Sequence, residues 1–340
     1  MRAAFGATYD VPDGYLNTPS VGVPPRQVAE AVHDAVARWR RGADTPADFD
    51  GAVLAARSGF ARLIGVPEDR VAIGASASQV VAMVAAGLPA GARVLTATGE
   101  FTSVTFPFAA RPGVVVEEVP LAELPHRVAG HDLVAVSVVQ SADGAVADLA
   151  GLRAACESAG VPVLLDATQA AGWLPLRLDW ADWVVCAAYK WLLAPRGVAW
   201  IAVHPRAHER TVPVAANWYA GEDPWDTTYG LPLRLAGDAR AFDLSPAWMS
   251  FVGAAASMTY LAELDLDAVH AHCTGLADSL LEQLSLPPAG SAIVALPAEG
   301  AADRLARAGV AASVRAGRAR VGFHLYNTSE DVDRVVGALA

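Results

Sequence analysis

The only lysine of the chain is the first side chain whose type suggests covalent chemistry. Lysine and arginine together number 25, and Lys190 is the single lysine among them. An arginine can replace a lysine in solvation and ion pairing, but its guanidinium stays protonated, whereas a buried ε-amine can lose its proton and condense with a carbonyl. Lys190 is therefore a candidate nucleophile, and a leftover surface lysine is the simpler alternative.

Asp166 is the second candidate. It ends the apolar run VPVLLD, and Lys190 closes the next apolar run, WVVCAAYK. In a parallel sheet, the carboxyl ends of the strands form the edge where ligands bind. An amine that holds an aldehyde as an imine and a carboxylate that keeps a pyridine nitrogen protonated are what pyridoxal 5'-phosphate requires. The two residues predict this cofactor, with a plain Asp–Lys ion pair as the structural alternative.

The stretch IGASASQVV predicts a phosphate site, because it combines a strand end, small residues and a helix start. The backbone N–H groups of Ser76 and Ala77, together with the helix dipole, would face an anion. Ser78 could add a hydroxyl to this site or simply cap the helix.

Alternating strand and helix patterns must position these residues. Because predicted strands and helices alternate along the first two thirds of the chain, we expect a mostly parallel α/β sheet that is covered on both faces by helices. The predicted buried strands cover 71–73, 94–97, 114–116, 133–139, 161–165, 183–187 and 198–203. The predicted helices of this part cover 25–41, 52–64, 78–86 and 149–159.

The last third of the chain has a different pattern. An aromatic, loop-rich stretch at 214–235 precedes a long helical segment, a second helix, short strands near Ile293, Ala311 and Val321, and a closing helix at 329–339. This order predicts a smaller α+β domain. We expect a large domain over 15–245 and a small domain formed by 1–14 and 246–340.

Composition excludes several classes of protein. The 340 residues carry a net charge of −11, which disfavours nucleic acids and anionic membrane surfaces as partners. A hydrophobic share of 54% indicates a globular chain, and no apolar run approaches the roughly 20 residues of a membrane span. The start lacks the basic and apolar regions of a secretory signal, and three unclustered cysteines fit a reducing cytoplasm. We therefore expect a cytoplasmic protein without a metal site.

Three motifs taken in order resemble one known family. DATQ, YKWLLAPRG, and SVRAG followed by RVGFHLYNTSEDVDRVV are similar to class V aminotransferases of pyridoxal-phosphate fold type I, the group of cysteine desulfurases, kynureninases and isopenicillin N epimerase. The resemblance covers essentially the whole chain. It implies a fold type I transferase, with a mostly parallel seven-stranded sheet in the large domain and a smaller α+β C-terminal domain.

The resemblance assigns roles around the cofactor ring. Lys190 matches the Schiff-base lysine, Asp166 the partner of the pyridine nitrogen, and Gln169 the residue that hydrogen-bonds the ring hydroxyl. Phe101 stands where the family stacks an aromatic residue or histidine on the ring, although it could be a core residue. Ser141 occupies the place of a polar residue near the ring oxygen or substrate, and a turn residue is the alternative.

The resemblance also assigns phosphate donors and implies a homodimer. Tyr189 matches a His or Tyr that donates to the phosphate. Ala187 stands where family members often have serine, so one donor is expected to be missing. Ser245, in FDLSPAW, matches a segment that reaches the partner subunit's phosphate site, which implies shared active sites.

Substrate contacts follow in the same way. Arg315, in SVRAG, matches the arginine that clamps the substrate α-carboxylate, a task that suits a planar guanidinium. Arg196 and Arg320 are weaker candidates for substrate binding, since most arginines of a chain lie on its surface. Trp218, in NWYAGEDPW, lies where the family's active-site loop contributes an aromatic residue, although such loops also bury domain interfaces.

The reaction implied by the family proceeds on an amino acid through an external aldimine and an α-carbanion, with Lys190 as general base. Desulfurases of the family use a mobile cysteine near the carboxylate arginine, and this chain has none after Cys273. We therefore expect a β-elimination lyase, cleaving a C–S or similar bond, that forms no persulfide on a cysteine. Transamination and epimerisation are the alternatives, and a non-catalytic binding protein of this fold is the alternative from another class.

Overall fold

The central element of the computed structural model, which describes residues 1–297 and 299–340, is a seven-stranded sheet. Strand β9 runs antiparallel to both its neighbours, and all other neighbouring strands are parallel. The mostly parallel sheet that the sequence predicts is thus confirmed. In spatial order the strands are β3 (Val71–Gly74), β9 (Ala199–Val203), β8 (Trp183–Ala187), β7 (Val163–Asp166), β6 (Leu133–Ser137), β4 (Arg93–Ala97) and β5 (Val115–Val119).

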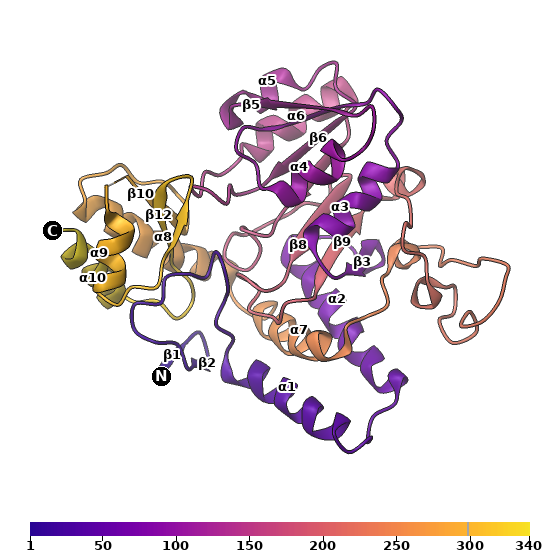
Figure 1. Ribbon diagram of the computed structural model, residues 1–340, viewed down its shortest axis with the longest axis horizontal. Coiled ribbons are helices and arrows are strands. Elements are labelled where there is room, and N and C mark those ends of the chain that lie inside the picture. The colour runs from indigo at the N-terminus through magenta and orange to yellow at the C-terminus, as the bar shows by residue number, and fades with distance from the viewer. Residues whose placement is uncertain (298) are drawn as a thin grey trace.

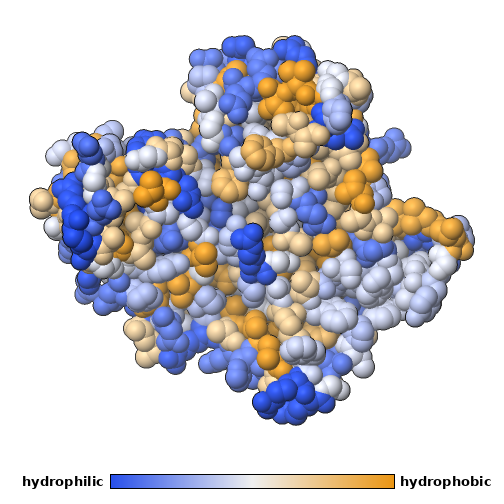
Figure 2. All heavy atoms as spheres, in the orientation of Figure 1, coloured by the Kyte–Doolittle hydropathy of each residue, from blue (hydrophilic) through white to orange (hydrophobic). Residues whose placement is uncertain are grey.

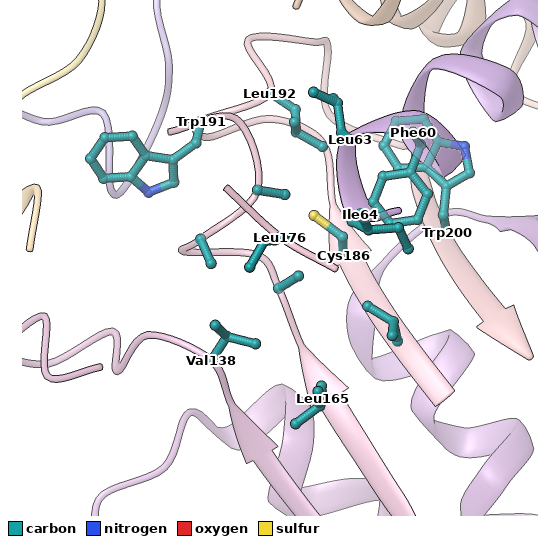
Figure 3. Close-up of a cluster of buried hydrophobic side chains, with 14 of the residues drawn as sticks. Phe60, Leu63, Ile64, Val138, Leu165, Leu176, Cys186, Trp191, Leu192 and Trp200 are labelled. Atoms are coloured by element: carbon teal, nitrogen blue, oxygen red, sulfur yellow. The ribbon is translucent and has the colours of Figure 1, made fainter. Parts of the chain in front are cut away.

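Both faces of this sheet are buried. Consecutive strand residues enter different apolar clusters, as Leu164 and Leu165 do, because side chains alternate across a strand. Helices α2 (Asp50–Ile64), α6 (Leu149–Ala159) and α7 (Trp248–Leu261) contribute to one cluster, and α3 (Ala77–Ala86) and α4 (Thr102–Ala109) to the other (Figure 1). In the first cluster Phe60 stacks on Trp200 with ring centroids 4.7 Å apart (Figure 3).

Local signals start and stop the helices around the sheet. The Asp148 side chain accepts from the N–H of Gly151 and caps α6. Helix α2 ends at Gly65, whose φ of 69° is a left-handed conformation that favours glycine. Helix α1 (Arg26–Trp39) packs against α7 and lies beside the entrance to the site described below.

The C-terminal part forms a separate apolar cluster beneath a three-stranded antiparallel sheet of order β10-β12-β11 (Figure 1). Its capping box at Thr328 and Asp331 starts the last helix, and Asp331 also pairs with Arg2 of the N-terminal hairpin. The elements are α8 (Leu266–Gln283), β10 (Ile293–Leu296), α9 (Ala301–Arg307), β11 (Ser313–Arg315), β12 (Arg318–Gly322) and α10 (Ser329–Leu339).

Most predicted elements are present within a few residues of their expected ends. The pattern missed the hairpin of β1 (Arg2–Ala4) and β2 (Ala7–Tyr9), the helices α4 and α5 (Leu124–Arg127), and the seven-residue helix α9. These strands and α5 are too short for a periodic signal, and α4 contains Pro107, which usually marks a break. Within the described residues, no helix combines the length and apolar character that a membrane crossing needs.

Candidate active site

Two adjoining cavities lie at the carboxyl edge of the sheet. The inner chamber, of about 170 Å³, lies among the residues that follow β3, β4, β6, β7 and β8. The outer chamber, of about 640 Å³, opens between this edge, helix α1 and the C-terminal part. Residues lining both chambers are Phe101, Ser141, Tyr189, Lys190 and Arg196.

Lys190 lies where the chambers meet. Its side chain is buried, and Nζ lies 5.2 Å from the centre of the Phe101 ring and 5.9 Å from that of Tyr189. Burial lowers the pKa of Lys190 to about 8, opposed by the negative charge of Asp166 and assisted by the positive charge of Arg320. The neutral, nucleophilic fraction of the amine near neutral pH is therefore much larger than that of an ordinary lysine, whose pKa is 10.5.

Asp166 ends β7 and faces the inner chamber. The carboxylate accepts from the backbone N–H of Thr168 at 2.8 Å, and burial raises its pKa despite this bond. In the described part of the chain, no ion pair compensates this carboxylate. A buried carboxylate without a cation fits the protonated nitrogen of a pyridine ring.

The other end of the inner chamber meets the start of α3. Ser76 caps this helix, its hydroxyl accepting from the N–H of Gln79 at 3.4 Å, while the Gln79 side chain accepts from the N–H of Ala75 at 2.8 Å. Ser76, Ala77 and Ser78 line the chamber with small neutral groups. A helix N-terminus with small neighbours suits a phosphate, so the chamber fits pyridoxal phosphate at both ends.

Gln169 and Ser141 also line the inner chamber, held in one buried network. The Gln169 amide donates to the Ser141 hydroxyl at 3.1 Å and to the Pro19 carbonyl at 3.0 Å, and its oxygen accepts from Trp191 at 2.7 Å. Protein partners thus use both N–H groups of Gln169. A cofactor hydroxyl would meet the remaining lone pair of its oxygen or the Ser141 hydroxyl.

Two buried positioning residues were not anticipated from the sequence. Glu100 accepts from the N–H of Phe101 at 2.7 Å, from the Ser137 hydroxyl at 2.6 Å and N–H at 2.7 Å, and from Gln140 at 2.9 Å. Thr168 accepts from the N–H of Ala187 at 3.0 Å and so joins the ends of β7 and β8. The visible signals were an acidic residue directly before Phe101 and the threonine of DATQ.

Arg320 is the deepest cation of the outer chamber, whereas the sequence made it only a weaker candidate. It is 1% exposed and donates to the Ser141 carbonyl. It also donates to the Ser141 hydroxyl at 3.0 Å and to the Ser20 hydroxyl at 3.0 Å. Burial lowers its pKa to about 10. Arg315 is half-buried nearby and donates to the Ser20 hydroxyl at 3.4 Å.

Ser245 and Trp218 line neither chamber within one chain. Ser245 is exposed on the segment before α7. Trp218 packs against Tyr219 and Trp225 with ring centroids 5.3 and 5.2 Å away, and both partners hydrogen-bond Asp50 of α2. A contact of either predicted residue with the site would therefore require a second copy of the chain.

Comparison with known proteins places this site in a family. The sequence profile described as Aminotransferase class-V matches residues 24–303. Isopenicillin N epimerase of Streptomyces clavuligerus is 27% identical over 380 aligned positions, which cover 95% of this chain and 93% of that protein. The uncharacterized aminotransferase YcbU of Bacillus subtilis (strain 168) is 27% identical over 310 positions, covering 84% of this chain and 82% of that protein.

A solved structure shares the fold. The cystine C-S lyase C-DES, in complex with its reaction product cysteine persulfide, superposes with a TM-score of 0.86 at 20% identity, over 96% of this chain and 97% of that chain. The family profile covers most of the chain, and the inner chamber fits the family's cofactor. The chain therefore belongs to the class V aminotransferase family and is a pyridoxal-phosphate enzyme of fold type I.

Proposed function

We propose that this enzyme is a β-elimination lyase that cleaves the C–S bond of an S-substituted cysteine without a cysteine persulfide. The observation that carries the proposal is the composition of the outer chamber. Among its lining residues in the described part of the chain, Lys190 is the only amine, and no carboxylate, imidazole or thiol is present. A sulfur transfer to a protein thiol lacks the thiol that it requires, and a two-base epimerisation would have only the Tyr189 phenol as a second proton-transferring group beside Lys190.

The residues around Lys190 have separate roles in the proposed elimination. Bound pyridoxal phosphate supplies an electron-accepting ring that stabilises negative charge at the substrate's α-carbon. The neutral amine of Lys190 takes the α-proton, and the Asp166 carboxylate balances positive charge at the ring nitrogen. Arg315, which donates only to Val314 and Ser20 in the described part of the chain, binds the α-carboxylate through its other N–H groups, with the buried guanidinium of Arg320 beside it.

The leaving group departs from the β-carbon into the outer chamber. The C–S bond breaks, its electron pair leaves with sulfur, and the proton held by Lys190 can neutralise the thiolate. With one water, the substrate yields a thiol, pyruvate and ammonia, so no oxidant or reductant is needed. Apolar side chains, including Val28 and Val32 of α1, line the space that receives the substituent.

The three cysteines are placed for packing and not for sulfur transfer. Cys156, Cys186 and Cys273 are all buried and unpaired, and none lines either chamber. Burial raises the pKa of Cys156 to about 12 and that of Cys273 further, so neither forms a thiolate near neutral pH. Figure 3 shows Cys186 enclosed by apolar side chains on the inner face of β8.

Amine transfer is the second candidate, since the same base and arginines could serve it and one relative is named an aminotransferase. Purified holoenzyme is incubated with S-substituted cysteines, and pyruvate and ammonia are measured beside 2-oxo-acid-dependent amine transfer. Elimination predicts stoichiometric thiol, pyruvate and ammonia, all lost in Lys190→Ala. Amine transfer without pyruvate would replace the proposed reaction.

We also propose a cytoplasmic homodimer in which Ser245 donates to the partner subunit's phosphate. Asp243, paired with Arg57 at 2.6 Å and accepting from the N–H of Ile73 at 2.8 Å, fixes the segment that presents Ser245 at the surface. The loop 222–235 projects from the molecule and exposes apolar residues on its outer edge, a further candidate for contact with a second copy (Figures 1 and 2).

Mixed dimers test this arrangement. Lys190→Ala and Ser245→Ala subunits, each impaired alone, are combined after unfolding and refolding. If Ser245 acts on the partner's site, one site of each mixed dimer keeps both residues and activity returns. No recovery, in a dimer verified by light scattering, would place Ser245 outside the partner's site.

A further inference from the structure

We infer that His324 and Ser257 are positioning residues that hold the turn carrying Lys190. This turn, residues 188–192, lies between β8 and β9, outside any helix or strand. His324 and Ser257 line neither chamber, so they act through the backbone of the turn and not on a ligand. The inference rests on Lys190 as the residue that holds the cofactor, and it does not depend on the reaction that follows.

Every backbone carbonyl of the turn accepts a hydrogen bond. The carbonyls of residues 188–190 accept from backbone N–H groups at 2.9–3.1 Å. The Trp191 carbonyl accepts instead from Nε2 of His324 at 2.9 Å, and the Leu192 carbonyl accepts from the Ser257 hydroxyl at 2.5 Å. Among the described residues neither of these two carbonyls has a second donor. Because a buried carbonyl without a donor is costly, loss of either side chain should release this part of the turn.

His324 is a neutral and fully buried donor. It follows β12 in the C-terminal part, and its Nδ1 has no hydrogen-bond partner in the part of the chain that the structure describes. Since a carbonyl can only accept, Nε2 must carry the single proton of the neutral ring. Burial lowers the pKa of His324 to about 3, so the ring stays neutral around neutral pH and keeps this hydrogen bond.

The same residue also fixes the indole of Trp191. The rings of His324 and Trp191 pack in a T-shaped arrangement with centroids 5.1 Å apart, and the indole N–H donates to the Gln169 side chain at 2.7 Å. Gln169 lines the inner chamber. His324 is therefore linked to two residues of the cofactor site, to Lys190 through the chain and to Gln169 through the indole.

Ser257 supports the turn from the other side. It is a fully buried residue of α7, a helix of the first apolar cluster. Leu193, which follows the turn, has a φ of 53°, a conformation that a side chain as large as leucine rarely adopts. Such a backbone persists only where the surrounding contacts fix it. The hydrogen bonds from Ser257 and His324 fix the two residues directly before it.

Covalent capture of the cofactor by the full chain tests the inference. Holoenzyme is stripped of cofactor and mixed with pyridoxal phosphate, and samples are trapped with borohydride over time. Mass spectrometry then measures the adduct on Lys190, the only lysine. His324→Gln keeps an N–H donor the same number of bonds from Cα, whereas His324→Met has the same length without a donor.

We expect His324→Met to capture the cofactor about tenfold more slowly or worse, because misplacing a reacting group by about 1 Å can cost about a hundredfold in rate. His324→Gln should stay within about threefold of the wild type, because its amide restores the donor to the Trp191 carbonyl. Rescue by the glutamine distinguishes positioning from the mere loss of a buried ring.

His131→Met is the matched control. His131 is also buried and donates to a carbonyl, that of Val128 at 3.3 Å, but it lies after α5 and lines neither chamber. It should lower the unfolding temperature without slowing cofactor capture. Equal slowing in His131→Met and His324→Met, at equal loss of thermal stability, would overturn the inference.

Ser257→Ala removes a single hydroxyl and keeps the test decisive if methionine at position 324 prevents folding. It should slow capture in the same direction as His324→Met. A wild-type rate in either folded variant would remove that residue from the proposal, and wild-type rates in all folded variants would overturn it.

Failure of the proposed function has different signatures. If the wild type forms no adduct on Lys190, the cofactor lysine and its positioning residues are both wrong. If the adduct forms but S-substituted cysteines give no pyruvate, the elimination alone is wrong. If pyruvate forms and the substitutions leave capture unchanged, the lyase stands and the positioning role fails.

Discussion

The backbone of Gly22 lies directly against the backbone of Lys190. The Gly22 N–H donates to the Tyr189 carbonyl at 2.9 Å, and a Cβ on Gly22 would lie 2.0 Å from the Lys190 carbonyl oxygen. No real side chain tolerates that separation. The N-terminal segment thus closes the chamber over Lys190 only because position 22 has no side chain.

Gly22→Ala is expected to displace this segment and to open the outer chamber. The clash is with backbone, so the cost is of overpacking size, about 1–3 kcal/mol in the free energy of unfolding. Thermal unfolding and the absorbance of bound cofactor report the change. Gly51→Ala is the matched control, because its Cβ would meet nothing within 4 Å and helix propensity favours alanine. Equal stability of the two variants would show that the segment adapts freely.

The reactivity of Lys190 should follow its lowered pKa. In cofactor-free protein the neutral fraction of the amine rises with pH and reaches half near pH 8, because the folded pKa is about 8. In the unfolded chain, the pH at which half of the Lys190 amine is neutral should rise toward the usual lysine pKa of 10.5. Acetylation followed by mass spectrometry measures this directly, since Lys190 is the only lysine. A midpoint near 10.5 in the folded protein would mean that the amine is solvated.

Glu100→Gln should loosen the inner chamber. The glutamine keeps the shape but presents an NH₂ group to donors that the carboxylate satisfied, including the N–H groups of Phe101 and Ser137. One unsatisfied buried group costs about 1–3 kcal/mol in the free energy of unfolding. The change should also lower the pKa of Asp166, which the Glu100 charge raises. Denaturant unfolding and the cofactor spectrum measure both effects.

The control for this substitution is Glu118→Gln, because Glu118 is an exposed residue of β5. It should leave unfolding within about 0.5 kcal/mol of the wild type, as surface changes usually do. A similarly small effect of Glu100→Gln would show that its hydrogen bonds are replaceable.

Replacement of all three cysteines by alanine or serine should preserve catalysis. Their thiols lie outside both chambers, so the expected loss is in stability, through the cavities left at Cys186 and Cys273. The ratio of pyruvate formation in the variant to that in the wild type is the measurement. Detection of a protein-bound persulfide by mass spectrometry during turnover would contradict the proposed sulfur chemistry.

Much of the inner chamber was predictable because each residue follows a strand whose apolar run is visible in the sequence. Asp166 and Lys190 follow successive strands, and parallel strands bring their carboxyl ends to one edge. Ser76, Ala77 and Ser78 were found through the helix start that they create. Local patterns and one topological rule therefore sufficed to bring these residues together.

The residues that line the outer chamber could not be predicted from local sequence patterns, because they are brought together by contacts between distant parts of the chain. Ser20 and Arg320 are 300 positions apart, yet they hydrogen-bond, and helix α1 supplies a chamber wall from the first tenth of the chain. With so many arginines in the sequence, composition gave no reason to prefer Arg320. Its burial and its lack of an ion pair among the described residues are properties of packing.

The sequence by itself predicted the cofactor and the residues that we expect to bind it, because a unique lysine and a strand-end aspartate have few substitutes among amino-acid side chains. Only the tertiary structure decided how the site is shaped and charged: which arginines face the lysine, that Gly22 closes over it, and that the cysteines lie elsewhere. The physical reason is that pKa shifts, clefts and charge clusters arise from desolvation and proximity between segments far apart in the chain. Strand patterns alone carry no information about those distances.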